Sequence, residues 1–234
     1  MATLLLRLTG PMQSWGVQSR FRVRDTEREP SKSGVVGLLC AALGRPRQAS
    51  VSDLAALRLG VRVDREGRLM RDYHTAGKGG YLKASGTVER NNLITSSRYY
   101  LSDAAFLVGL ESADRDLVMQ LHDALYDPHW PLFLGRKAFV PGLPVWLSDG
   151  LQEGTLDDVL RDYPSLIQHR SEHKSMDRVR VVLEMNDGDE VRPDQPLSFS
   201  ERRFAPRRVK TIFIDPPPLT EDPLYPDSGA VSDI

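Results

Sequence analysis

The stretch from Thr3 to Gly44 constrains the fold of this chain more than any other. It opens with the apolar run Leu4–Leu8, which predicts a buried strand ended by Gly10-Pro11. A loop with alternating arginines follows and leads to Pro30-Ser31-Lys32-Ser33-Gly34; its arginines are Arg20, Arg22, Arg24 and Arg28. The small apolar run from Val35 to Gly44 then predicts a helix, with Ser31 or Ser33 as its N-cap.

The start of this helix is a candidate anion-binding site. The first N–H groups of a helix have no partner within it, and the helix dipole favours negative charge there. Gly34 and Gly37 each cost about 1 kcal/mol relative to alanine, which makes sense if another backbone, from a strand or a nucleic acid, comes close. A tightly packed helix without a ligand explains the same residues equally well, so both interpretations stay open.

The first two thirds of the chain predict an α+β fold. After the helix, Leu59–Asp64 alternates like a strand, Glu66-Gly67 indicates a hairpin turn, and Leu69–Thr75 is expected to be the returning strand. Further strands are predicted at Arg98–Leu101 and Ala104–Leu110, and an amphipathic helix is predicted from a Ser112 cap to Asp127-Pro128. The order strand, helix, strand, strand, strand, helix favours a ferredoxin-like core, similar to RNA-recognition domains, that carries extra strands.

Three segments differ from this core. Residues 76–97 are rich in glycine and poor in large apolar residues, which predicts a protruding hairpin ordered by a partner. Residues 146–214 predict a smaller β-rich half with strands at Val179–Met185, Leu197–Ser200 and Val209–Ile214. The acidic, proline-rich residues 215–234 predict a disordered tail. We therefore expect a ferredoxin-like domain over 1–145, the β-rich region and the tail.

Composition excludes several classes of protein. The net charge of −1 argues neither for nor against nucleic acid, since the acidic tail masks a basic body. A single cysteine, Cys40, rules out a disulfide framework and indicates a reducing, cytoplasmic compartment. The run Leu4–Leu8 is far too short to cross a membrane. The histidine spacing predicts no metal site, and the sequence contains no P-loop or Rossmann fingerprint, so we expect neither a metal nor a cofactor.

Aromatic residues intermixed with basic ones favour binding of single-stranded RNA. Base stacking combined with phosphate contacts is the usual means of holding such RNA, and Trp15 and Tyr73 are the candidates for stacking. His74, with Tyr73 and Lys78 nearby, could instead supply the acid and base of metal-independent RNA cleavage. Packing of Tyr73 and His74 at a strand end is a third interpretation.

Five ordered motifs resemble a known family. They are Gly10-Pro11-Met12-Gln13-Ser14-Trp15-Gly16, Pro30–Leu39, Arg71-Asp72-Tyr73-His74-Thr75, Tyr99–Ala104 and Leu134-Gly135-Arg136-Lys137. Together they resemble the fifth Cas family of the RAMP superfamily, the CasD-type subunits of type I-E CRISPR Cascade complexes. The resemblance spans roughly residues 3–214, is loose in the C-terminal part and does not include the tail.

The resemblance implies a ferredoxin-like palm with a β-hairpin thumb at about 76–97. It implies a non-catalytic subunit that caps the 5′ handle of the CRISPR RNA, contacts the backbone subunit of the seventh Cas family and the large subunit, and meets target DNA only through the complex. Type I-C relatives cut the precursor RNA themselves, so an endoribonuclease using His74 is the alternative. We expect thirteen RNA contacts: Gln13, Trp15, Arg20, Arg22, Ser31, Lys32, Ser33, Tyr73, His74, Lys78, Arg98, Arg136 and Lys137.

Overall fold

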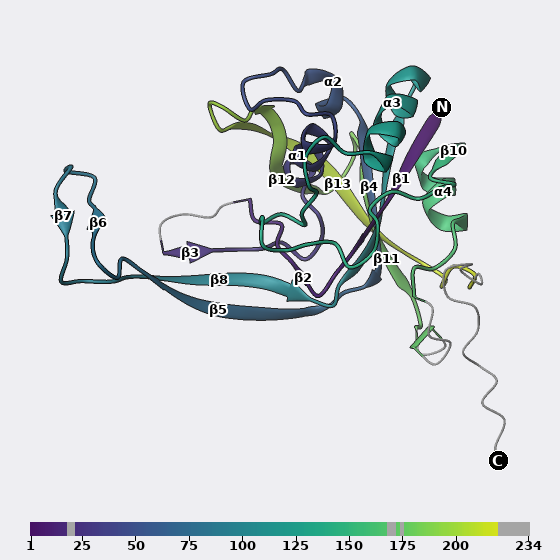
Figure 1. The fold of residues 1–234 in the computed structure, drawn as a ribbon. Coiled ribbons are helices and arrows are strands. Elements are labelled where there is room, and N and C mark those ends of the chain that lie inside the picture. The colour runs from purple at the N-terminus through teal and green to yellow at the C-terminus, as the bar shows by residue number, and fades with distance from the viewer. Residues whose placement is uncertain (18–21, 168–171, 174–175, 220–234) are drawn as a thin grey trace, which may run out of the picture.

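A mixed α+β fold with a long protruding hairpin is seen in the computed structural model, which describes residues 1–17, 22–167, 172–173 and 176–219 (Figure 1). The main helices are α1 (Lys32–Ala42), α3 (Arg115–Tyr126) and α4 (Leu156–Asp162), and α2 is the short helix Ser52–Ala55. The structure confirms the predicted fold class.

The centre of the molecule is a ferredoxin-like sheet. Its four strands are β1 (Ala2–Thr9), β4 (Arg58–Arg65), β9 (Ala105–Ser112) and β10 (Leu151–Glu153). They lie in the order β10-β1-β9-β4, and every neighbouring pair is antiparallel. With α1 between β1 and β4 and α3 between β9 and β10, this is the βαββαβ arrangement that the sequence predicted.

The C-terminal strands extend this same sheet. They are β11 (Val179–Glu184), β12 (Glu190–Ser198) and β13 (Arg203–Ile214), and β11 pairs with β4 so that the seven strands form one sheet. The division expected at residue 145 therefore does not separate two sheets. Strands β12 and β13 begin earlier than the predicted Leu197 and Val209, because they pair with each other from Glu190↔Val209 to Ser198↔Arg203. The charged residues Asp194 and Arg207 also pair with each other inside the protein.

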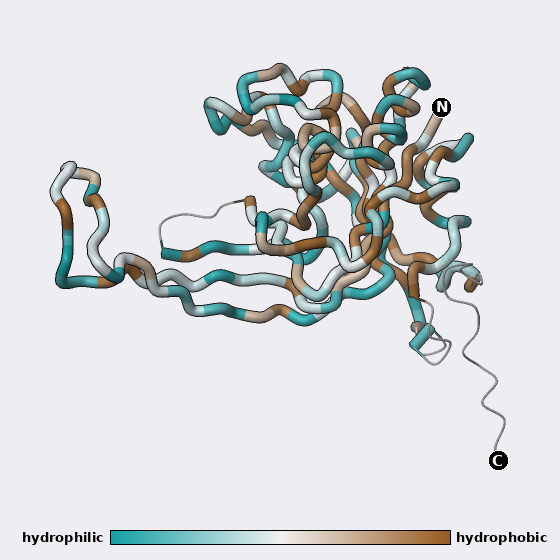
Figure 2. Tube along the Cα trace, viewed as in Figure 1, coloured by the Kyte–Doolittle hydropathy of each residue, from teal (hydrophilic) through white to brown (hydrophobic). Residues whose placement is uncertain are grey.

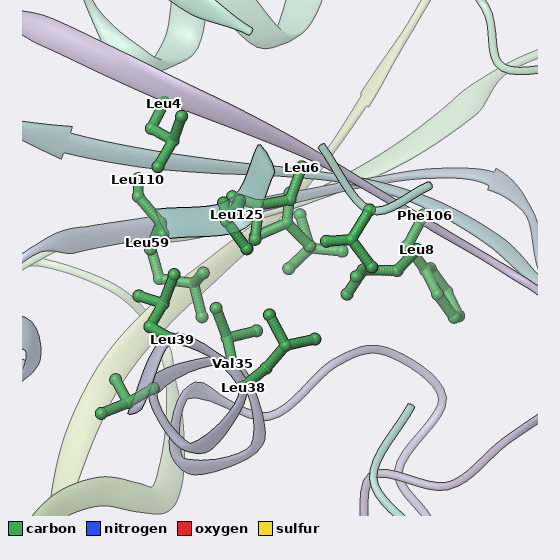
Figure 3. Packing of buried hydrophobic residues seen from close by; sticks show 14 of the residues in the cluster. Leu4, Leu6, Leu8, Val35, Leu38, Leu39, Leu59, Phe106, Leu110 and Leu125 are labelled. Atoms are coloured by element: carbon green, nitrogen blue, oxygen red, sulfur yellow. The ribbon is translucent and has the colours of Figure 1, made fainter. Parts of the chain in front are cut away.

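Helices cover both faces of the sheet. On one face, side chains from β1, β4 and β9 pack against α1 and α3 (Figure 3). The residues in this contact include Leu4, Leu6, Leu8 and Phe106 from the sheet, Leu39 from α1 and Leu125 from α3. On the other face, α4 packs against Leu5 and Leu107. Gly60 and Gly109 are paired across β4 and β9, and a Cβ at either would lie 2.5 Å from a leucine methyl of α4. Hydrophobic segments accordingly concentrate in the sheet and the helices (Figure 2).

The helix starts differ in how far they match the sequence. Ser31 caps α1 as expected, since its hydroxyl accepts a hydrogen bond from Gly34 N at 3.3 Å. The cap of α3 is Asp114, which accepts from Leu117 N at 3.0 Å, and not Ser112. Ser112 instead accepts from Asp114 N at 3.0 Å and so fixes the capping residue.

The thumb is longer than expected. Strands β5 (Arg68–Ala76) and β8 (Ile94–Ser102) pair over their whole length, from Arg68↔Ser102 to Ala76↔Ile94, and the short strands β6 (Tyr81–Leu82) and β7 (Val88–Glu89) form the tip (Figure 1). The expected return of 69–75 onto 59–64 is wrong, because β9 and β11 occupy the two edges of β4. The hairpin therefore spans 68–102 and includes the 76–97 segment.

Two short strands hold the base of the thumb. Strand β2 (Met12–Gln13) pairs antiparallel with the end of β8, and β3 (Val23–Arg24) pairs parallel with its middle, through Val23↔Ser97 and Arg24↔Arg98. The arginine-bearing loop after β1 is thereby attached to the thumb. This places Arg24 beside Arg98 in the middle of β8 (Figure 1).

Candidate nucleic-acid interface

The start of α1 is already occupied by a carboxylate of the protein itself. The backbone N–H of Lys32 donates to Asp194 Oδ2 at 2.7 Å, and Asp194 also accepts from Arg207 at 2.7 and 3.0 Å. The Lys32 ammonium, 1% exposed, donates to both oxygens of Glu184 at 2.8 and 2.9 Å. Burial lowers the pKa of Lys32, and the Glu184 carboxylate opposes that shift.

This geometry argues against the expected phosphate contacts of Ser31 and Lys32. Lys32 N donates to the buried Asp194 carboxylate and Gly34 N donates to Ser31, so two of the first N–H groups of α1 already have partners. Lys32 is committed to Glu184, and Ser31 is 4% exposed and caps the helix. The interpretation of a packed helix without a ligand fits α1 best.

Gln13 and Trp15 form a buried polar pair instead of an RNA-binding surface. Gln13 is 0% and Trp15 1% exposed. The Gln13 amide donates to Leu8 O at 3.0 Å and Ala104 O at 2.9 Å, and the Trp15 indole N–H donates to Gln13 Oε1 at 3.2 Å. A Cβ on Gly34 would lie 2.8 Å from the Trp15 ring, so the group that comes close to this glycine is the indole. This burial argues against the predicted base stacking on Trp15.

A cavity of about 430 Å³ lies where three of the sequence motifs meet. The segment after β2 contributes Ser14 to Gly16, the start of α1 contributes Ser31, Ser33 and Gly34, and the loop Leu134–Lys137 contributes Gly135 and Arg136. The rest of the wall consists of Phe199 from the β12–β13 turn, Phe204 from the start of β13, and Arg24, Asp25 and Arg47. We call this cavity the arginine pocket.

Arg136 is held at the pocket by carbonyl groups. Its guanidinium donates to Tyr99 O at 2.9 Å and Arg24 O at 3.3 Å, and it lies 5.5 Å from the centroid of the Phe139 ring. Burial lowers its pKa, and the positive charges of Arg98 and Arg24 lower it further. Arg136 is therefore a fixed cation in a region of concentrated positive charge.

The loop before Arg136 depends on a glycine. Gly135 has φ 88°, and a Cβ there would collide with the carbonyl of Ser14. Ser14 N in turn donates to Leu134 O at 3.1 Å. Because only glycine tolerates both the conformation and the close approach, this residue fixes the guanidinium that follows it.

The thumb separates two residues that the catalytic hypothesis needs together. Asp72 pairs with Arg98 and His74 with Ser96, so Asp72, His74 and Arg98 lie on one face of the hairpin. Tyr73, 63% exposed, is on the opposite face. His74 forms a hydrogen bond with the Asp72 carboxylate, so the hairpin places His74 together with Asp72 and not with Tyr73.

The other predicted contacts are spread along the surface. Lys78 lies exposed in the turn at the thumb tip, Lys137 is exposed beside Arg136, and Arg22 is exposed with its carbonyl accepting from Ser97 N at 2.8 Å. Arg20 lies outside the described residues. Of the thirteen candidates, the pocket brings together Trp15, Ser31, Ser33 and Arg136, the first two of which are buried by packing.

Sequence reasoning did not name four residues of the pocket wall as contacts: Arg24, Arg47, Phe199 and Phe204. Phe199 and Phe204 come from the β12–β13 turn and the start of β13, more than 150 positions beyond α1, and no local pattern links them to it. Arg47 follows the helix as part of a basic turn and donates to Phe199 O at 3.0 Å. The concentration of five basic residues within 201–210 was the one available signal.

The described part of the chain contains no group of three or more His, Cys, Asp or Glu side chains placed to hold a metal ion. It also contains no helix of sufficient length and hydrophobicity to span a membrane.

The fold and the pocket together define a class: a ferredoxin-like RAMP protein with a hairpin thumb and an arginine-lined pocket at the base of the thumb. Within this class, the chain belongs to the CRISPR-associated Cas5 family, whose model matches residues 3–210.

Individual relatives agree with this membership. The chain is 34% identical over 159 residues to the CRISPR system Cascade subunit CasD of Escherichia coli (strain K12), an alignment covering 62% of this chain and 70% of the relative. A solved structure described as a Cas protein shares 47% identity at a TM-score of 0.76, covering 93% of this chain and 98% of the other. A chain of a CRISPR RNA-guided surveillance complex shares 34% identity at a TM-score of 0.77, covering 92% and 91%.

Proposed function

We propose that the protein is a crRNA-binding subunit of a type I-E Cascade surveillance complex, where it caps the 5′ handle of the CRISPR RNA. The observation that carries the proposal is the group of Arg24, Arg98 and Arg136 at the base of the thumb. None of the three forms an ion pair with a carboxylate among the described residues, and the pKa of Arg136 is lowered by burial and then by the other two charges. The family and the names of the relatives support the same role.

Phosphate groups are the ligands that such a group of arginines favours. Guanidinium groups bind phosphate oxygens through paired, charge-assisted hydrogen bonds. A phosphate beside Arg24 and Arg98 would also relieve the repulsion that three neighbouring cations impose on one another. Each contact displaces a counterion, so binding through these residues depends strongly on salt.

The thumb favours partners beyond the RNA. Its tip exposes Leu82, Val88 and Leu93, with 73%, 56% and 55% of each side chain accessible. Exposed apolar residues on a protruding hairpin are typical of a surface that another subunit covers. We assign this surface to the backbone subunit, and we expect the large subunit to dock elsewhere on the same protein, with target DNA contacted only through the complex.

The test is RNA retention in the assembled complex. Arg24→Gln with Arg98→Gln should weaken crRNA retention and reduce the slope of log K against log salt by about 2, one phosphate per arginine. Arg115→Gln is the matched control, since Arg115 is an exposed arginine of α3 paired with Glu153, and it should change neither. Unaltered retention and slope in the double variant would refute the proposal.

We further propose that the subunit does not cut RNA. The two faces of β5 keep Tyr73 and His74 apart, and this argues against an acid–base pair made of these two residues. Purified protein incubated with labelled repeat RNA in chelator should leave the RNA intact. Cleavage that His74→Ala abolishes would instead establish the alternative, a processing endoribonuclease.

A further inference from the structure

We propose that the aromatic wall of the arginine pocket is a receptor for one unstacked RNA base, held against Phe204 with its flanking phosphates on Arg47 and Arg24. The inference rests on the proposed function and assigns a role to residues outside the motifs that carry the family resemblance. Its basis is the juxtaposition of two phenylalanines and three arginines around one cavity.

The two phenylalanines are supported differently. Phe199 is partly buried and packs against the main core, with its ring 3.9 Å from where a Cβ on Gly37 would lie. Phe204 is 43% exposed, and its ring centroid lies 6.4 Å from that of Phe199 with the planes inclined by 64°. The inner ring therefore fixes the outer one, which retains exposed surface at the pocket.

The turn that begins with Phe199 and leads to Phe204 in β13 is held in place. It spans residues 199–202 between β12 and β13, and Arg202 adopts φ 53° within it. Ser198 Oγ accepts from Glu201 N at 3.2 Å, and Arg47 Nε donates to Phe199 O at 3.0 Å. A platform fixed before binding loses less entropy when a ligand arrives.

Size and charge favour a nucleotide over an apolar ligand. The volume of about 430 Å³ lies in the range of sites for small ligands and excludes a duplex. Arg24, Arg47 and Arg136 line the pocket together with one acidic residue, Asp25. Aromatic faces beside guanidinium groups are the combination that holds single-stranded nucleic acid, whereas an apolar side chain from a partner protein would leave this positive charge without a ligand.

An abasic scan of the RNA handle in the assembled complex tests the inference. With wild-type protein, removing the base at one position should weaken retention about tenfold, the effect of losing one stacked base. Phe204→Ala should weaken retention of intact RNA by the same factor. In this variant, removing the base at that position should cause no further loss of retention. Phe204→Tyr, which keeps the aromatic face, should restore both.

A matched control and three opposing outcomes keep the test decisive. Phe213 is a second exposed phenylalanine of β13, at 58%, and Phe213→Ala should leave the whole scan unchanged. Equal retention of intact RNA by Phe204→Ala and wild type would overturn the inference, as would an unaltered abasic profile. If Phe204→Ala lowers subunit assembly without any RNA, the wall is a protein contact and the inference is wrong. Failure of the wild-type complex to hold the handle at all would instead refute the proposed function.

Discussion

The molecule contains two groups of basic side chains that look alike in sequence and differ in what they bind. At the start of α1, Lys32 and Arg207 are neutralised by Glu184 and Asp194 within the protein. At the base of the thumb, Arg136 donates to two carbonyl groups and Arg24 lines the pocket, and neither forms an ion pair among the described residues. The contrast shows that the charge of a motif does not reveal whether the fold supplies a carboxylate partner.

Breaking the internal group should have the largest effect on stability. Asp194 is 2% exposed and accepts hydrogen bonds from Lys32 N and Arg207. Because removal of one partner leaves a buried charge without compensation, Asp194→Asn should lower the free energy of unfolding by about 3 kcal/mol, measured by urea denaturation. Asp123→Asn, at a side chain 85% exposed on α3, should change it by less than about 0.5 kcal/mol. Equal stability of the two variants would contradict the structural role.

Gly135→Ala should affect both stability and RNA retention, because the added Cβ collides with the Ser14 carbonyl and displaces Arg136. We expect a loss of at least about 2 kcal/mol in unfolding free energy and weaker retention of the handle. Gly79→Ala is the control for backbone strain without a steric collision, because Gly79 also has positive φ, 91°, but nothing lies within 4 Å of its Cβ position. This variant should lower the free energy of unfolding by about 1 kcal/mol. A Gly135 variant no worse than this control would show that the close approach is unimportant.

Lys32→Gln and Arg136→Gln should affect different properties: the first variant should change protein stability, and the second should change the salt dependence of RNA retention. Lys32→Gln should lower stability while leaving the salt dependence of RNA retention unchanged in the folded complex, since Lys32 is 1% exposed. Arg136→Gln should reduce the slope of log K against log salt by about 1. A changed slope in the Lys32 variant would mean that this lysine reaches phosphate after all.

The smallest effect concerns the thumb tip and its pH dependence. The Lys83 side chain, then the Asn91 backbone, lowers the pKa of Glu89 from 4.5 to about 2. A depressed carboxyl pKa means that the stabilisation is complete above the ordinary pKa and is lost as pH falls toward about 2. An NMR titration of Glu89 should show this low midpoint, and Lys83→Gln should raise it. Arg90→Gln should leave the midpoint in place, and an unchanged midpoint in the Lys83 variant would remove the cause assigned here.

The sequence predicted the local elements well and their partners poorly. Continuous apolar runs such as Leu4–Leu8 and Ala104–Leu110 are strands because burial on both faces demands them. The pairing of 69–75 was misjudged, because local alternation does not reveal that β9 and β11 already occupy both edges of β4. Strand periodicity identifies a strand but not its neighbour.

The sequence identified the segments that form the candidate site, but not which of their side chains are buried and paired inside the protein. The three segments that meet at the arginine pocket were all singled out, and Ser31 was correctly named as a cap. The burial of Trp15 and Lys32 could not be foreseen, because it depends on Gly34 and on Glu184, which is 152 positions from Lys32. Long-range carboxylate partners decide whether a lysine is structural, and no local window contains them.

Because the thumb joins the sheet through two short connections, the length of its strands sets the distance of its tip from the sheet. Two residues, Glu66 and Gly67, connect β4 to β5, and two, Asp103 and Ala104, connect β8 to β9, with Gly67 packed so closely that a Cβ would lie 2.6 Å from Ser102 O. Lengthening both strands by two residues would move the tip outward by about 7 Å and keep every side chain on its face. Lengthening them by one would turn the outer part over. The reach of the thumb can therefore change in steps of two residues per strand, without altering the sheet from which the thumb extends.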